Sequence, residues 1–145
     1  MEVIELARAM GKGDDVHCRE LVAEAWVNDR VHDQLTRHVS RAVASGDLGG
    51  AATSLPRLSH GVVSERVVDI ELEIAGARAG VWSEDDVAGK YGIHYLTRQG
   101  RSLGGGSNEM QRNIISERLL GMPREPAADR DKPYRDVRRN TLPAG

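Results

Sequence analysis

The sequence predicts an all-α domain. Apolar residues recur at three- and four-residue steps through two long segments, 16–44 and 54–75, which is the spacing of one face of a helix. No segment shows the sustained alternation of apolar and polar residues that indicates a half-buried strand. A third helical segment, 107–120, begins after a run of glycines and ends at a glycine and a proline. At 145 residues, the chain has the length of one ordinary domain.

The N-terminal half contains a short and a long helix. Residues 2–10 predict a short amphipathic helix, and a Gly- and Asp-containing break follows it. Asp14 or Asp15 is expected to cap the long helix from Val16 to Ala44, because its carboxylate accepts from backbone N–H groups that lack an intrahelical partner. The apolar stripe of this helix consists of Leu21, Ala25, Val27, Val31, Leu35, Val39 and Val43.

Residues 45–54 contain three glycines and predict a loop before the second long helix. Thr53 or Ser54 is expected to cap that helix, with Pro56 in its first turn, where a missing N–H costs nothing, and Gly76 at its end. Its apolar stripe consists of Leu58, Val62, Val63, Val67, Ile70 and Ile74. Gly61 inside the helix costs roughly 1 kcal/mol relative to Ala. Its presence predicts close packing against another helix at that point.

The pattern is weaker between residues 77 and 102. A helical turn near Ser83 or Glu84 and a short helix over 91–101 are expected there. The third main helix should run from Ser107, as N-cap, to about Leu120, with Gly121 just beyond its end. Residues 1–123 therefore predict a helical bundle. Residues 124–145 are charged, contain three prolines and predict a tail that is extended or disordered.

The glycine run before the third helix has the build of an anion-binding loop. Gly104, Gly105 and Gly106 permit positive φ and let a ligand approach the backbone closely. The first N–H groups of the following helix favour an anionic group. Glycine-rich turns also precede helices that bind nothing, so both interpretations stay open. The segment is neither a GxGxxG motif after a strand nor a Walker A loop.

Composition and charge exclude several classes of function. A net charge of −2, with two Trp, three Tyr and no Phe, offers neither a general basic surface nor base-stacking platforms, so no nucleic-acid partner is expected. No apolar run is long enough to span a bilayer, and the N-terminus does not resemble a secretory signal. The single Cys suits a reducing compartment, so a cytoplasmic location is expected. The five histidines lack metal-site spacing, so no metal site is expected.

Three segments carry a resemblance to a known family. The stretch GGGSNEMQRNIISERLLGMPREP, residues 104–126, resembles the last-helix signature of the acyl-CoA dehydrogenases, of bacterial type. IELARAMGKGDDVHCRELVAEAWVNDRV resembles the second helix of that family's C-terminal four-helix bundle, and PRLSHGVVSERVVDIELEIAG resembles the third. The resemblance implies a fragment that starts after the first bundle helix and lacks the family's middle β-domain.

The family's reaction is the α,β-dehydrogenation of an acyl-CoA thioester, in which a carboxylate removes the α proton and FAD accepts the β hydrogen as hydride. In many members the base is a Glu just before the last glycine of the motif, and that position is Gly105 here. Other relatives carry the Glu on the first bundle helix, and some bacterial relatives pair a catalytic subunit with one that lacks the base. The resemblance therefore implies no catalytic residue in this chain.

The resemblance also implies contacts with FAD, which lies at a subunit interface in the family. Residues at and after the glycines contact its adenosine portion; they correspond to Gly104, Gly106, Ser107, Asn108 and Glu109. Glu109 faces the adenosine end and is not assigned as a base. The loop that ends the preceding helix approaches the pyrophosphate from the neighbouring subunit, and it corresponds to Glu73 and Gly76. Glu73 replaces the family's usual Gln and puts an acid near the phosphates.

Two functions follow as hypotheses. In the first, the chain is the C-terminal portion of an FAD-dependent acyl-CoA dehydrogenase, inactive alone, in a homo- or hetero-oligomer whose other domains or partner subunit bind the acyl-CoA. In the second, it is a non-catalytic helical oligomerisation module, a partner subunit or a truncated remnant. Because one bundle helix is expected to be missing, apolar residues such as Val31, Leu35, Val67 and Ile70 should be poorly covered.

Overall fold

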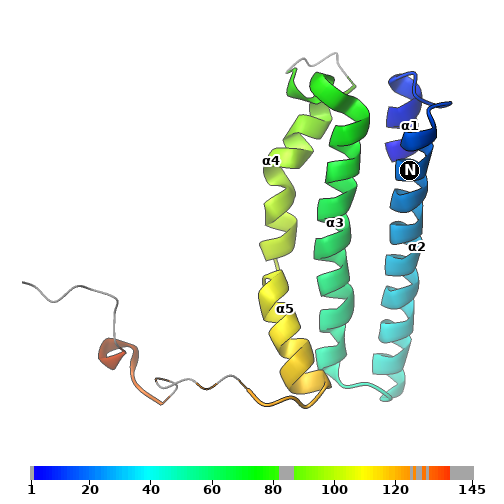
Figure 1. The fold of residues 1–145 in the computed structure, drawn as a ribbon. Helices are drawn as coiled ribbons and strands as arrows, with labels where there is room; N and C mark the ends of the chain where they lie inside the picture. Colours follow the sequence, from blue (N-terminus) through cyan, green and yellow to red (C-terminus); the bar gives the residue numbers. More distant parts are fainter. Residues whose placement is uncertain (1, 82–86, 125, 127–128, 130, 138–145) are drawn as a thin grey trace, which may run out of the picture.

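The computed structural model describes residues 2–81, 87–124, 126, 129 and 131–137. Its main body consists of three helical columns (Figure 1). Helices α2 (Val16–Ser45) and α3 (Ser54–Ala75) form two of them, and α4 (Gly89–Leu103) with α5 (Asn108–Ile114) stacks end to end as the third. The short α1 (Glu2–Ala9) lies beside α2. The other elements are single turns: η1 (Gly50–Thr53), η2 (Gly76–Gly80), η3 (Ile115–Leu119) and η4 (Tyr134–Asp136).

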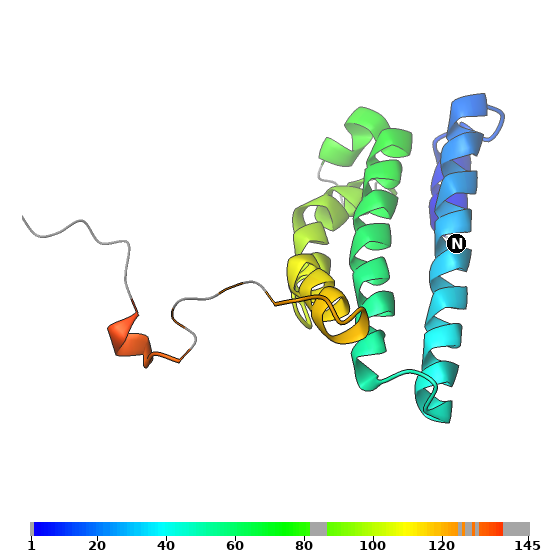
Figure 2. The ribbon, with the colours of Figure 1, turned by 60° about the horizontal axis from the view of Figure 1, so that its bottom comes forward.

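Helix α3 is the central column. Figures 1 and 2 both place it between α2 on one side and α4 with α5 on the other, and α1 contacts it as well. Every regular element among the described residues is helical, which confirms the all-α prediction. The expected turn near Ser83 lies outside the described residues. The division into a bundle and a tail at Pro123 stays a prediction.

The predicted ends of α2 and α3 are mostly confirmed. Asp15 caps α2, because its carboxylate accepts from the Cys18 N–H at 2.7 Å. Gly76, with φ of +60°, ends α3. Thr53 occupies the N-cap position of α3 as expected, but its side chain makes no capping bond, because η1 runs directly into α3 and the Thr53 hydroxyl donates to the Gly50 carbonyl at 2.8 Å.

The core lies where α1, α2, α3, η2 and α4 meet. Leu6 and Ile70 are completely buried, and Ile74 and Tyr91 are 1% exposed. Val31 is 60% exposed, as expected for an uncovered face, while Leu35 and Val67 are half-buried. The expectation for Ile70 is wrong, because α1 packs over this end of α3 and covers it.

The third column differs from the prediction. Helix α4 is longer than the expected 91–101 segment, and it contacts α3 through Tyr91 in the core and through the His94–Glu71 and Arg98–Asp69 pairs. The predicted 107–120 helix is present, but it is α-helical only to Ile114. Residues 115–119 form a π-helical turn, in which the Leu120 N–H donates to the Ile115 carbonyl at 2.9 Å.

Gly61 is a point of close contact between α3 and α5, which confirms the packing predicted from its position. A Cβ added to Gly61 would collide with the side-chain amide of Asn108, a residue only 7% exposed. We therefore expect Gly61→Ala to lower the free energy of unfolding by roughly 1–2 kcal/mol, because overpacking outweighs the gain in helix propensity. Urea denaturation followed by circular dichroism measures the change.

Gly100→Ala is the matched control, because a Cβ at this α4 position meets nothing within 4 Å. It should raise the free energy of unfolding by about 0.5–1 kcal/mol through helix propensity alone. Equal stabilisation by both substitutions would contradict the Gly61–Asn108 contact.

Candidate functional site

The candidate site is the glycine loop, residues 104–107, which joins α4 to α5. Gly105 and Gly106 adopt φ of +76° and +99°, conformations that favour glycine. Ser107 has extended backbone, and its hydroxyl accepts from the Met110 N–H at 3.3 Å, which confirms the predicted N-cap. The chain therefore makes a sharp, defined turn into α5.

Two side chains hold the carbonyl groups of the loop. Arg57, in the first turns of α3, donates from Nε to the Gly104 carbonyl at 2.8 Å and from Nη2 to the Arg101 carbonyl at 3.0 Å. Gln111 of α5 donates from Nε2 to the Gly105 carbonyl at 3.0 Å and is 5% exposed. The loop is thus fixed from the helix beside it and from the helix after it.

Glu73 and Gly76 lie at the opposite end of α3. Glu73 is sixteen residues after Arg57. At about 1.5 Å per residue, this separates the two by roughly 24 Å along the helix. His17 of α2 is hydrogen-bonded to Glu73, with 2.6 Å between Nε2 and Oε1. Lys12 donates to the Ile74 carbonyl at 2.7 Å. The predicted site residues therefore form two clusters, one at each end of α3.

Comparison with known proteins agrees with this architecture and its glycine loop. The family model described as "Acyl-CoA dehydrogenase, C-terminal domain" matches residues 3–120. The chain belongs to the acyl-CoA dehydrogenase family. It is similar to the acyl-CoA dehydrogenase IpdE1 of Mycolicibacterium smegmatis (32% identity, covering 85% of this chain and 30% of that protein). It is also similar to IpdE1 of Mycobacterium tuberculosis (30% identity, covering 85% of this chain and 31% of that protein).

The chain thus spans about 30% of the length of these curated relatives. No solved structure matches it significantly.

By resemblance, Gly105 is expected to occupy the position of the family's usual base. Gly105 has a left-handed backbone that a glutamate rarely adopts. A Cβ added there would lie 3.3 Å from Nε of Arg57, tighter than an ordinary van der Waals contact. The local structure is therefore adapted to glycine, and no catalytic residue is assigned.

Glu109 remains a poor candidate for a base. Its side chain is 77% exposed. Its pKa is lowered by a hydrogen bond from its own backbone N–H, by a bond with Ser107 and by the charge of Arg112. A carboxylate with a lowered pKa accepts a proton less readily. An ionised Glu109 suits a surface contact rather than proton abstraction.

Sequence reasoning missed two polar features. Arg57 reaches the glycine loop across 47 positions, and no motif links the two. Glu71 is 3% exposed and is paired with His94, with 2.9 Å between Oε2 and Nδ1. The sequence does contain a signal for this pair, because Glu71 directly follows Ile70 of the apolar stripe. A carboxylate buried at such a position requires a polar partner.

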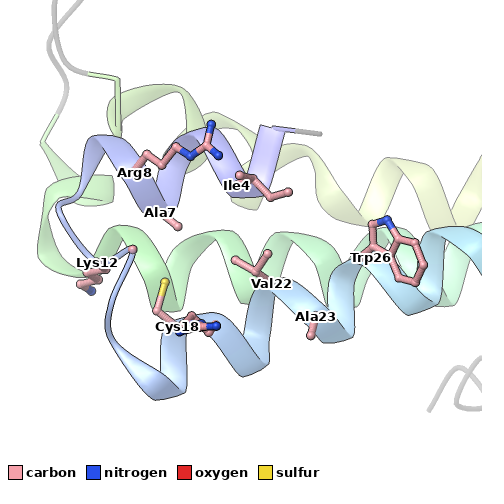
Figure 3. A pocket seen from close by; sticks show the side chains of 10 residues that line it. Ile4, Ala7, Arg8, Lys12, Cys18, Val22, Ala23 and Trp26 are labelled. Atoms are coloured by element: carbon pink, nitrogen blue, oxygen red, sulfur yellow. The ribbon is translucent and has the colours of Figure 1, made fainter.

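A groove of about 460 Å³ lies elsewhere, between α1 and the start of α2 (Figure 3). Its walls include Ile4, Val22 and Trp26, with Arg8 and Lys12 among its other lining residues. None of the predicted FAD-contacting residues lines it. In the described part of the chain, no three His, Cys, Asp or Glu side chains are placed to hold a metal ion, and no helix could cross a membrane.

The His17–Glu73 pair predicts a local pH dependence. The hydrogen bond to Glu73 raises the pKa of His17 above its ordinary value, so the pair stabilises the fold below about pH 6.5, the usual unfolded value for His. This contribution is lost as the pH rises through the folded pKa. Glu73→Gln should bring the pKa of His17 down toward its ordinary value, as measured by NMR titration of the ring.

Glu20→Gln is the control, because Glu20 lies 4.0 Å from the same ring and contributes less to the pKa shift. An equal effect of the two substitutions, or none from Glu73→Gln, would contradict the assignment.

Proposed function

We propose that this chain is the C-terminal helical portion of an FAD-dependent acyl-CoA dehydrogenase, and that it supplies surfaces that contact FAD and neighbouring subunits. The observation that carries the proposal is the glycine loop, held by Arg57 and Gln111 and followed by the family's last-helix sequence. Bound FAD would supply the redox chemistry by accepting hydride. The residues of this chain would bind and orient it.

The polar, exposed surface of the loop would face the adenosine portion of FAD. The Gly104 and Gly105 carbonyls are bonded to donors of the protein itself, which reduces their repulsion toward an anionic ligand. Glu109 is exposed, and Gly106 and Ser107 are half-buried, so they form the outer surface with Gly104. Asn108 packs against α3, so we assign ligand contact to its backbone rather than to its side chain.

The second cluster would serve the pyrophosphate of a flavin bound by a neighbouring subunit. Glu73 and Gly76 are exposed at the end of α3. The carboxylate of Glu73 would repel phosphates, but the His17 ring is bonded to it and has a raised pKa. A protonated His17 offsets the charge of Glu73 and makes this end of α3 acceptable to an anion.

Catalysis would require residues outside this chain. Gly105 supplies no base, and the chain spans only about 30% of its curated relatives. Other domains or a partner subunit would bind the acyl-CoA and hold the carboxylate that removes the α proton. We place the protein in the cytoplasm, since its single Cys18 is free and buried.

Flavin retention tests this function. The purified chain, mixed with FAD and passed through a sizing column, should elute with the visible absorbance band of the flavin. Calorimetric titration with ADP, a stand-in for the adenosine end, should show binding that Ser107→Pro weakens. Thr53→Pro, which adds a proline at an exposed position outside the loop, is the control. A chain that binds neither FAD nor ADP would count against the proposal.

A helical oligomerisation module is the second candidate. It is favoured by exposed apolar side chains on two helices: Val27 and Val31 of α2 are 50% and 60% exposed, and Leu96 and Leu103 of α4 are 67% and 61% exposed. Surfaces of this kind mark subunit interfaces.

We expect light scattering to give a mass above that of the 15.8 kDa monomer. Leu96→Glu should shift the population toward monomer, because it puts a charge into the apolar face. Gln99→Glu, with the same charge change at an exposed α4 position, should not. A well-behaved monomer would refute this expectation.

A further inference from the structure

We infer that Arg57 is the positioning residue of the glycine loop, and that it sets how tightly the chain holds the adenosine end of FAD. The second half of this inference rests on the proposed function. The first half concerns the loop alone and is tested separately.

Arg57 lies at the beginning of α3 and is hydrogen-bonded to the end of α4. The last carbonyl groups of a helix have no intrahelical partner and carry partial negative charge. At the end of α4, the Arg57 guanidinium donates to the carbonyls of Arg101 and Gly104 together. The same cation therefore satisfies unpaired acceptors and faces the negative end of the α4 dipole.

The glycines make the loop depend on this contact. Three consecutive glycines have no side chains to fix their conformation, and glycine loses more backbone freedom on ordering than any other residue. Gly105 and Gly106 nevertheless hold defined positive φ angles. Arg57 and Gln111 bond the successive carbonyls of Gly104 and Gly105, and they do so from α3 and α5. Of these two donors, Arg57 is the one that comes from α3, the central column of the bundle.

The geometry requires an arginine. Its planar guanidinium reaches two carbonyls that are three residues apart in sequence, while a lysine ammonium is a single point charge. The Nη1 atom of Arg57 is buried, as is Oδ1 of Asn108, and these are the two buried side-chain atoms without a hydrogen-bond partner among the described residues. Both belong to the side chains that join the loop region to α3.

The test compares Arg57→Met, Arg57→Lys and the control Arg101→Met. Arg57→Met keeps the apolar stem and removes the donors. Arg101→Met removes a cation from the same neighbourhood but retains the backbone carbonyl that Arg57 uses. Hydrogen exchange of the loop amides that are hydrogen-bonded, those of Gly104 and Gly106, is measured relative to α1 and α2, and the Kd for FAD and for ADP is measured by calorimetry.

Arg57→Met should speed exchange of the loop amides by about tenfold or more, the effect of losing a charged hydrogen bond, and weaken FAD and ADP binding by a similar factor. Arg57→Lys should retain part of the protection of the loop amides and part of the affinity for FAD and ADP. Arg101→Met should leave both within about twofold of the original chain, below the effect of one charged bond. Exchange in α1 and α2 should stay unchanged, which a general loss of stability would not allow.

Unchanged loop exchange in Arg57→Met would overturn the positioning role, as would a rise spread evenly over all helices. Faster loop exchange with unaltered flavin affinity would overturn the link to the adenosine end. A parent chain that binds neither FAD nor ADP would also overturn that link, together with the proposed function, while the exchange measurement still decides the role of Arg57.

Discussion

The arrangement of the helices depends on α3, which packs against α1 and α2 on one side and against α4 on the other. Toward α1 and α2 it presents apolar residues, with Ile70 and Ile74 in the core. Toward α4 it presents part of the same core, which Tyr91 joins, together with two carboxylates: Glu71 pairs with His94, and Asp69 pairs with Arg98 at 2.8 Å. A buried carboxylate without a partner is costly, so α4 is stable only in the register that brings His94 to Glu71. The glycine loop follows directly from the end of α4, and its position depends on that register.

This division explains how much of the fold could be predicted from sequence. Helices α2 and α3 pack through apolar stripes, so their spacing reveals them, and local chemistry fixes Asp15, Gly76 and Ser107 as caps or ends. Helix α4 packs through Tyr91 in the core as well as through polar pairs, and its first residue, Gly89, follows no side-chain cap, so the sequence does not mark where it begins. The covering of Ile70 by α1 and the direct passage from η1 into α3 are tertiary features that spacing does not encode.

The local turn of the candidate site could be predicted from the sequence, but its long-range contacts could not. The motif itself contains the glycines, the cap Ser107 and the donor Gln111, so the local turn follows from adjacent residues. Arg57 acts across 47 positions, and its contact exists only once α3 and α4 have packed. Gly105 depends on both local sequence and tertiary packing. Its φ is a local property, whereas the Arg57 guanidinium that would crowd a side chain at this position is placed there by the packing of α3 against α4.

The distance between the two predicted clusters has a consequence for assembly, if the proposed function holds. The glycine loop and Glu73 lie at opposite ends of α3, separated by roughly 24 Å along a rigid helix. A twofold axis perpendicular to α3 would bring the loop end of one subunit to the Glu73 end of its partner, and this contact would occur twice. The loop of one chain and the α3 terminus of another would then meet the same flavin. Under the proposed function, assembly would complete each cofactor site, and oligomerisation would be part of flavin binding.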